Sequence, residues 1–143
     1  MNNYTNICPD ASLVIRLLLN DKEGTPIDLL WYGWFQAGFN LVAPTLLFYE
    51  VSNALYRYVV HGQLTVDEVD KALAAAMQLG IQLYGDASLH QGALSMAQEL
   101  GLPATYDAHY LVLAKRLGAQ FCTADQRLFN TIQGKLAWVN LWT

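Results

Sequence analysis

Charged side chains are scarce in this sequence. Only 14% of the 143 residues are Asp, Glu, Lys or Arg, and 8 basic residues face 12 acidic ones, which gives a formal net charge of −4. Proteins that bind duplex nucleic acid by neutralising its phosphates usually carry a basic excess. The composition therefore argues against a protein that binds duplex nucleic acid mainly by neutralising its phosphates.

Cysteine is almost absent, with only Cys8 and Cys122 in the chain. Both lie in stretches with the pattern of buried strands, where a free cysteine behaves as a small core residue. No Cys and His residues follow the spacing of a zinc site. The sequence therefore excludes a zinc module and predicts two core thiols.

Long apolar runs and targeting features are also lacking. Asn, Gly, Gln or a charge interrupts every apolar stretch, so no run approaches the ~20 residues of a membrane span. The start, MNNYTNICPD, lacks the basic residues and apolar region of a signal peptide. We expect a cytoplasmic protein with no membrane partner. Because 54% of the residues are hydrophobic, surplus apolar surface predicts a protein partner or self-association.

Strand-like and helix-like segments alternate along the whole chain. This alternation predicts an α/β fold, with a central, mostly parallel sheet between helices, and the length predicts a single domain, residues 1–143. Ligands of such sheets bind at the carboxyl ends of the strands. The expected strands are residues 4–9, 41–44, 81–84, 119–123 and 136–141, and the expected helices are residues 11–19, 26–38, 46–61, 66–79, 88–100, 103–117 and 124–133.

The stretch from Pro103 to Phe129 carries the clearest functional signal. Asp107 shares a helical face with Tyr110 and Ala114. A carboxylate in a packed apolar face is costly unless it is paired or binds a metal, which makes Asp107 a candidate site residue. Asp125 follows the next expected strand, where it is either a helix N-cap or a site residue.

Two further acids lie at matching places. Asp10 follows the first expected strand, where it either caps the next helix or projects into a cleft. Glu50 lies at the edge of the apolar stripe of the helix after the second strand, and an ion pair with Arg57, two helical turns further on, is the alternative explanation for it. Setting four acids aside leaves 8 basic and 12 − 4 = 8 acidic residues, so the acidic excess is no larger than one site needs.

Together these four acids predict a metal site. Carboxylates that converge on one cleft cannot all ionise without a compensating cation, and oxygen-only ligands favour Mg²⁺ or Mn²⁺. Such an ion orients a phosphodiester, activates a water and stabilises developing charge. The predicted metal ligands and catalytic residues are Asp10, Glu50, Asp107 and Asp125.

Three segments resemble a known family: ICPDASLVIRLLL, PTLLFYEVSNALYR and YDAHYLVLAKRLGAQFCTADQRLF. They are similar to the PIN-domain family, in particular to toxins of the VapC type from bacterial and archaeal toxin–antitoxin pairs. The resemblance covers nearly the whole chain, and its most specific part is YDAHYLVLA followed by TADQRL. It implies a three-layer α/β/α PIN-like domain, Mg²⁺-dependent endoribonuclease activity on RNA, and an antitoxin protein as partner.

The resemblance also assigns roles to single residues. The family's acids match the four acids above one by one, Thr123 matches a hydroxyl residue near the metal, and Ser12 is a candidate to act there through a water. Pro9 stands where the family usually has a plain aliphatic residue, which leaves open the direction in which the Asp10 carboxylate points. Basic candidates for holding RNA, each also explained as a solvated surface residue, are Arg16, Arg57, Lys115, Arg116 and Arg127.

Other small α/β proteins with clustered acids fit less well. A phosphoryl-accepting receiver domain needs adjacent acids after its first strand and a lysine at the end of a late strand, and a haloacid-dehalogenase phosphatase needs Asp-x-Asp where this chain has Asp10-Ala11-Ser12. The open alternatives are a non-catalytic PIN scaffold that binds protein or RNA, a PIN nuclease of RNA processing, and a DNA or flap nuclease. The intact acids argue against the first, and the lack of insertions argues against the last.

The second expected helix is apolar nearly all round. Trp31 and Trp34 share one face, whereas the other sides carry Leu29, Tyr32 and Phe35. Because one domain covers only one face of a helix, the uncovered aromatic side chains predict a recognition surface. By the resemblance, an antitoxin peptide lies across this helix and reaches toward the acids. A homodimer through another face is also expected.

Overall fold

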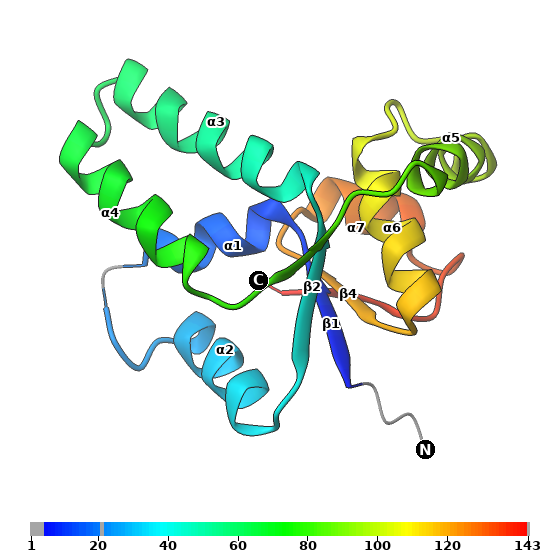
Figure 1. Cartoon of the computed structure of the whole chain (residues 1–143), viewed down its shortest axis with the longest axis horizontal. Helices are drawn as coiled ribbons and strands as arrows, with labels where there is room; N and C mark the ends of the chain where they lie inside the picture. Colours follow the sequence, from blue (N-terminus) through cyan, green and yellow to red (C-terminus); the bar gives the residue numbers. More distant parts are fainter. Residues whose placement is uncertain (1–4, 21, 143) are drawn as a thin grey trace.

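The computed structural model describes residues 5–20 and 22–142, and it confirms an α/β fold around a five-stranded parallel sheet (Figure 1). The strand order is β3–β2–β1–β4–β5. The strands are β1 (Asn6–Pro9), β2 (Asn40–Pro44), β3 (Gln82–Tyr84), β4 (Gln120–Thr123) and β5 (Val139–Leu141). The helices are α1 (Ala11–Leu18), α2 (Pro26–Gln36), α3 (Leu46–Val60), α4 (Val66–Met77), α5 (Ser88–Leu100), α6 (Tyr106–Leu117) and α7 (Gln126–Ile132).

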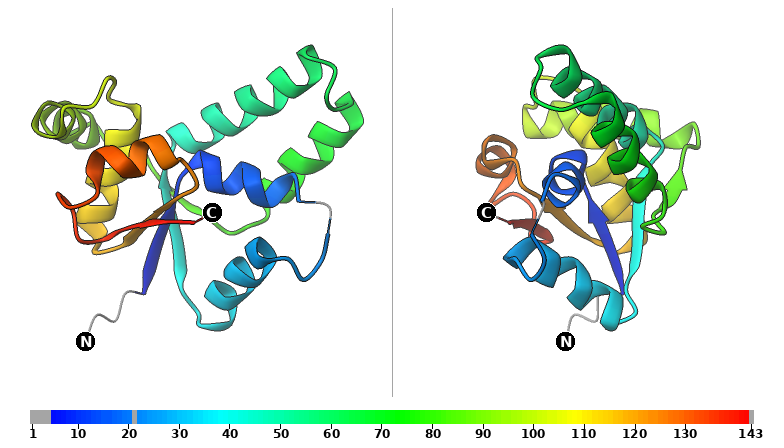
Figure 2. Two further views of the ribbon diagram at one scale, coloured as in Figure 1. Left: turned by 180° about the vertical axis from the view of Figure 1, so that it is seen from behind. Right: turned by 90° about the vertical axis from the view of Figure 1, so that its left-hand side faces the viewer.

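Two groups of helices cover opposite faces of the sheet (Figures 1 and 2). On one face α1 packs against β4 and is surrounded by α2, α3 and α4. On the other face α6 packs against β1, β2 and β4, with α5 beside it, while α7 lies next to the edge strand β5. The arrangement confirms the three-layer α/β/α architecture predicted from the sequence.

The core lies between these layers and the central strands. Phe121 of β4 and Tyr110 of α6 are both fully buried, with ring centroids 6.4 Å apart. Cys8 and Cys122 are buried free thiols in neighbouring strands, as predicted. Within the described residues, no helix combines the length and the apolar character needed to cross a membrane.

Three sequence-based expectations about local structure are wrong. Pro103 does not open a helix, because the chain needs the residues after Gly101 to reverse from α5 into α6, which begins only at Tyr106. The last helix begins at Gln126, two residues later than expected. The last strand, expected over residues 136–141, covers only Val139–Leu141, and Trp138 just before it is only partly buried.

The strand order changes direction at β1. β1 lies between β2 and β4, so the chain leaves β1 toward one side of the sheet and later returns to the other side. Open α/β sheets bind ligands outside the carboxyl ends of the strands at such a reversal. Here these ends are Pro9 of β1 and Thr123 of β4, and the backbone N–H of Asp10 still donates to the carbonyl of Cys122 at 3.0 Å.

Candidate active site

Asp10 occupies the turn from β1 into α1 and is only 4% exposed. Its Oδ1 accepts hydrogen bonds from the Leu13 backbone N–H (3.1 Å) and the Ser12 hydroxyl (2.6 Å), and its Oδ2 accepts one from the Thr123 hydroxyl. Burial raises the pKa of Asp10 to about 6, although the three hydrogen bonds lower it, and the charge of Asp107 raises it further. The N-cap and site interpretations of Asp10 are therefore compatible.

The hydroxyls of Ser12 and Thr123 form a clamp around this carboxylate. Each hydroxyl donates to Asp10 and accepts a backbone N–H, from Ala124 to Ser12 Oγ and from Asp125 to Thr123 Oγ1, both at 3.0 Å. These backbone donors favour the orientation in which the single hydroxyl proton points at Asp10. The end of β4 is thus tied to the start of α1, and both residues that the resemblance singled out contact Asp10 directly.

Asp107 lies in the first turn of α6 and is half-buried. Burial raises its pKa, and the charge of Asp125 adds to the rise. The charge of Asp107 in turn raises the pKa of both Asp10 and Glu50. Asp107 is therefore the electrostatic centre that links the other three acids.

Glu50 is held by a contact that the sequence did not predict. The hydroxyl of Tyr110, a fully buried residue of α6, donates to Glu50 Oε1 at 2.6 Å. Burial raises the pKa of Glu50, this hydrogen bond lowers it, and the charge of Asp107 raises it. Neither of the two ion pairs in the described part of the chain involves Glu50 or Arg57, so the alternative explanation by a local ion pair is not what the structure shows.

Asp125 combines two roles that the sequence left open. Its Oδ1 accepts hydrogen bonds from the backbone N–H groups of Arg127 (3.0 Å) and Leu128 (3.1 Å), which makes it the N-cap of α7. Its charge also acts on Asp107. Capping fixes the carboxylate through one oxygen only, so the other oxygen is available to a ligand.

The four acids retain the capacity to bind a cation. Among the described residues, the known hydrogen bonds engage one oxygen each of Glu50 and Asp125, and one of the two Asp10 oxygens accepts only a single bond. A carboxylate offers about four lone-pair positions, so each acid keeps at least one. No Lys or Arg forms an ion pair with any of the four within residues 5–20 and 22–142.

The acids do not form a closed cage around a metal. In the described residues, no three His, Cys, Asp or Glu side chains are arranged to hold a metal ion on their own. Mg²⁺ usually keeps several waters and takes one or two carboxylates from the protein. The oxygen-only set, with its uncompensated negative charge, therefore fits a hydrated hard cation rather than a fully protein-ligated ion.

The structure brings together two histidines that no motif in the sequence connects. His90 Nδ1 of α5 lies 2.9 Å from His109 Nε2 of α6, and His109 Nδ1 lies 2.7 Å from the carbonyl oxygen of Thr105. Since that carbonyl can only accept, His109 Nδ1 carries a proton. Two rings in direct hydrogen bond leave no space for a phosphate between them, so the pair is not arranged as the acid and base of a nuclease.

The raised pKa of Asp10 predicts a pH-dependent penalty. Asp10 ionises less readily in the folded state than in the unfolded state. Below about pH 4 it is protonated in both states and does not lower the free energy of unfolding. As the pH rises toward the folded pKa of about 6, the cost of its ionisation increasingly lowers that free energy. A shift of this size corresponds to about 3 kcal/mol at most. We expect Asp10→Asn, which keeps an N-cap residue, to raise the free energy of unfolding by about 1–3 kcal/mol at pH 7, and to have little benefit at pH 4.

Urea unfolding at both pH values measures this effect in metal-free buffer. Asp70→Asn, at an exposed acid of α4, is the matched control and should show no such pH dependence. Equal stability of Asp10→Asn and the unmodified protein at pH 7 would contradict an uncompensated buried charge.

Comparisons with known proteins find similar sequences and similar structures. No protein-family model matches the sequence. Ribonuclease VapC9 of Mycobacterium tuberculosis (strain H37Rv) is 28% identical over 129 residues, which cover 90% of this chain and 93% of that protein. Ribonuclease VapC3 of the same organism is 40% identical over 86 residues, or 60% of this chain and 61% of that protein.

Solved structures share the fold. The crystal structure of PAE2754 from Pyrobaculum aerophilum aligns with a TM-score of 0.68 and 24% identity, covering 90% of this chain and 81% of that one. A chain of a toxin–antitoxin complex from Klebsiella pneumoniae aligns with a TM-score of 0.64 and 15% identity, covering 94% and 95%. With the sequence relatives, these matches confirm the resemblance predicted from the motifs: the chain is a relative of the VapC-type proteins and has the PIN-domain fold.

Proposed function

We propose that this chain is a divalent-metal-dependent endoribonuclease, the toxin of a toxin–antitoxin pair, which hydrolyses RNA phosphodiester bonds in the cytoplasm. The observation that carries the proposal is the coupling of Asp10, Glu50 and Asp125 through Asp107 at the carboxyl edge of the sheet, with no Lys or Arg paired to them in the described residues. The relatives that are named VapC ribonucleases support the same activity.

Each site residue has a role in this proposal. A bound Mg²⁺ or Mn²⁺ would supply the positive charge that polarises a phosphodiester and lowers the pKa of a water. Asp10 and Asp107 would hold the principal ion, while Asp125 and Glu50 would hold a second ion or orient the attacking water. Ser12 and Thr123 keep the Asp10 carboxylate in place through their hydroxyls. Tyr110 does the same for Glu50.

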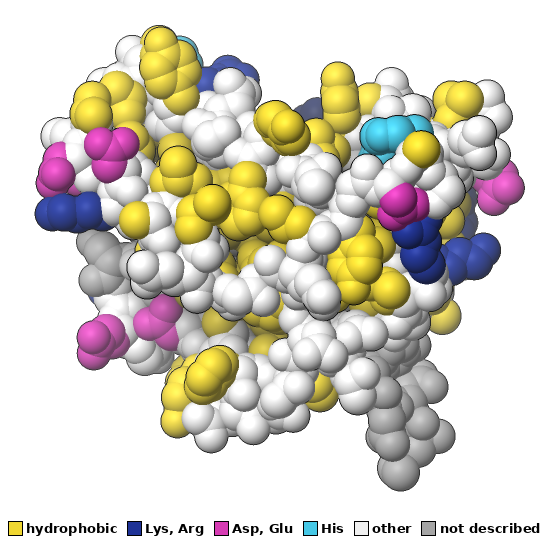
Figure 3. Space-filling model, viewed as in Figure 1, with side chains coloured by type: hydrophobic (Ala, Val, Ile, Leu, Met, Phe, Trp, Pro, Cys, Tyr) yellow, Lys and Arg dark blue, Asp and Glu magenta, His cyan; other side chains and the backbone are white. Residues whose placement is uncertain are grey.

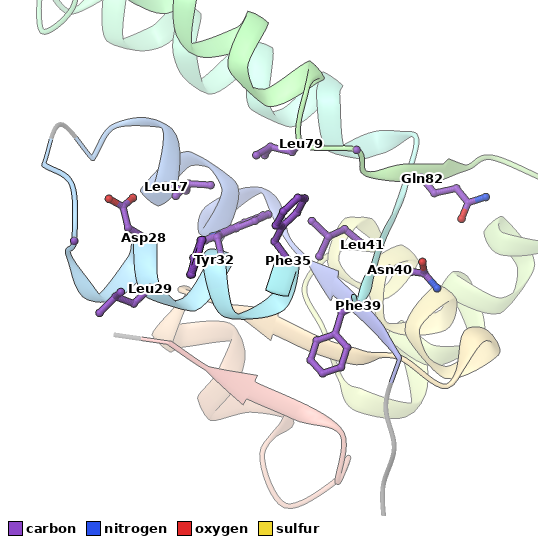
Figure 4. A pocket seen from close by; sticks show the side chains of 13 residues that line it. Leu17, Asp28, Leu29, Tyr32, Phe35, Phe39, Asn40, Leu41, Leu79 and Gln82 are labelled. Carbon is purple, nitrogen blue, oxygen red and sulfur yellow. The ribbon is translucent and has the colours of Figure 1, made fainter. Parts of the chain in front are cut away.

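The partner proposal rests on a pocket beside α2, which we call the α2 pocket. It has a volume of about 740 Å³ and lies between α2, α1, the start of β2 and the chain after α4 (Figure 4). Figure 3 shows hydrophobic side chains gathered across the face of the molecule above α2. The three side chains predicted from the sequence line this pocket and are 60%, 61% and 79% exposed: Leu29, Tyr32 and Phe35.

The α2 pocket also contains a buried donor without an acceptor. Trp31 lines it and is only 7% exposed, yet its indole N–H has no hydrogen-bond partner in the described residues. Buried indole donors usually find a partner. An antitoxin segment with apolar side chains for Tyr32 and Phe35 and a polar acceptor near Trp31 would suit the pocket, and we propose this as the antitoxin site.

A homodimer would use a different surface. Tyr49 and Tyr106 are 73% and 60% exposed and line a smaller pocket that shares no residue with the α2 pocket. Aromatic side chains are enriched in interfaces. We therefore propose this surface for self-association, which leaves the α2 pocket accessible to an antitoxin.

The first test concerns metal binding. Mn²⁺ at about ten times its Kd should stabilise the folded protein by about 1.4 kcal/mol, or roughly 3–5 °C in Tm, by mass action. Asp107→Asn removes the acid that couples the other three and should shrink this shift, whereas Asp70→Asn should not. Thermal unfolding with and without millimolar Mn²⁺ measures it, and a Tm indifferent to Mn²⁺ between pH 6 and 8 would count against the metal site.

The second test concerns the reaction. The purified protein should cleave a mixed RNA pool with Mg²⁺ and not with EDTA, and should leave 5′-phosphate and 3′-hydroxyl ends, because a carboxylate site suits attack by water rather than by the 2′-hydroxyl. Asp10→Asn and Asp107→Asn should lose about 100-fold or more in rate. Products with 2′,3′-cyclic phosphate would contradict water attack, and near-normal cleavage by either variant would remove that residue from the mechanism.

The third test concerns the partner. Tyr32→Ala and Phe35→Asp should weaken inhibition by the cognate antitoxin by about tenfold or more, in the range of exposed aromatic anchors, while cleavage by the free protein stays largely intact. Tyr56→Ala, at a tyrosine of α3 that is 65% exposed and lies outside the α2 pocket, is the control. Titration of cleavage activity with antitoxin gives the inhibition constants, and sedimentation of the same samples reports the oligomeric state.

Full inhibition of both variants would show that the α2 pocket is not the antitoxin site. A change in sedimentation of the free variants would instead assign α2 to the homodimer.

A further inference from the structure

A second pocket opens on the α1 side of the candidate active site. It has a volume of about 620 Å³, and its walls come from α1, the start of α2, α3 and the segment after β5. We call it the Trp142 pocket. The residues that matter here are Ser12 and Arg16 of α1, Tyr58 of α3 and Trp142.

Two residues that line the Trp142 pocket are connected to Asp10 by hydrogen bonds, one directly and one through Thr123. Ser12 donates its hydroxyl proton to Asp10 at 2.6 Å. The backbone N–H of Trp142 donates to the carbonyl of Thr123 at 2.8 Å, and the Thr123 hydroxyl donates to Asp10. The position of Trp142 relative to the acid is thus set by backbone pairing next to β4.

Arg16 and Trp142 form a cation–aromatic pair in this pocket. The guanidinium carbon of Arg16 lies 5.7 Å from the centroid of the Trp142 ring, within the range of an attractive contact. Arg16 lies one helical turn after Ser12, on the same face of α1, and is exposed. Neither ion pair of the described residues involves Arg16, so its charge is available to an anion.

This combination suits single-stranded RNA. The acids repel phosphates, so a strand that reaches them gains from a cation beside the neighbouring nucleotide. Bases of single strands stack on aromatic rings, and Arg contributes both charge and cation–π contact. The partly buried Trp142 ring and the half-buried Tyr58 supply such a platform next to the one exposed cation in the lining of this pocket.

We propose that the Trp142 pocket binds one nucleotide of a single-stranded RNA, adjacent to the phosphate that is cleaved. Trp142 stacks on the base of this nucleotide, and Arg16 pairs with its phosphate. This inference rests on the proposed ribonuclease function and names the residues that position its substrate. Both are positioning residues, because they hold the neighbouring nucleotide and do not contact the reacting atoms.

Binding of RNA without cleavage tests the proposal. The probe is a short, fluorescein-labelled, random-sequence single-stranded RNA, and the protein is the full chain carrying Asp107→Asn. We expect Trp142→Ala and Arg16→Gln to weaken binding by about tenfold, and Trp142→Phe to retain most of it. Lys71→Gln removes one positive charge at an exposed side chain of α4 and should leave the affinity within about twofold, as expected of a solvated surface charge.

The salt dependence separates the two roles. Loss of one phosphate contact should lower the slope of log affinity against log salt by about 0.7 for a single strand. Arg16→Gln should show this change, whereas Trp142→Ala should keep the slope and lose affinity at every salt concentration. Tm values of all variants verify that they fold. If Trp142→Ala does not fold, Trp142→Phe replaces it in the test.

Cleavage kinetics on the Asp107-intact protein then distinguish this inference from the proposed function. With metal-dependent cleavage, Arg16→Gln and Trp142→Phe should act mainly on KM. Cleavage by the unmodified protein together with unchanged RNA affinity in the Arg16 and Trp142 variants would overturn the nucleotide site alone. Binding losses as predicted, but no cleavage under any metal condition, would support the site and overturn the nuclease. Weakened antitoxin binding with unchanged RNA affinity would make the pocket a protein contact.

Discussion

A buried carboxylate that pairs with no Lys or Arg among the described residues is the constraint on which the site depends. Asp10 is removed from water at the turn from β1 into α1, and three donors hold it in place. Burying a charge in this way is costly, and hydrogen bonds offset only part of the cost, since the pKa is still raised. The surrounding core, with Phe121 and Tyr110 fully buried, supplies the stability that allows the fold to tolerate it.

Helix α1 separates the two surfaces that matter for recognition. Leu17 lines the α2 pocket, whereas its neighbour Arg16 lines the Trp142 pocket. One pocket is apolar and holds an indole donor with no acceptor among the described residues, and the other combines an aromatic ring with an exposed arginine. A single short helix therefore lies between two pockets of different chemistry, with Asp10 at its amino end.

Local patterns predicted most of the fold and singled out the four acids as candidates. Thr65 and Glu68 form a capping box at the start of α4, a signal that the local sequence carries, and the alternation of strands and helices follows from hydrophobic period and turn residues. For Asp10 and Asp125 the sequence left two interpretations, and the structure shows that capping and electrostatic coupling occur together.

Contacts between distant segments could not be predicted in the same way. Tyr110 meets Glu50 across 60 positions, and His90 meets His109 between two helices. The Arg16–Trp142 pair joins the first helix to the last segment of the chain. Periodicity compares residues within one element, and only the packing of the sheet brings these partners together. The expectation of a helix start at Pro103 was wrong because it relied on local sequence alone. Proline is compatible with a first helical turn, but the chain uses this segment to reverse from α5 into α6.

The pairing of β1 with β4 has a consequence for biosynthesis. Pro9 aligns with Cys122, and the hydroxyl that clamps Asp10 comes from Thr123, 113 positions later. Contacts of such separation form late, because a long loop must close first. During translation, a nascent chain that lacks β4 has Asp10 and Ser12, but it has neither Thr123, which completes the clamp, nor Asp125. The four acids are thus brought together only when most of the polypeptide has been made.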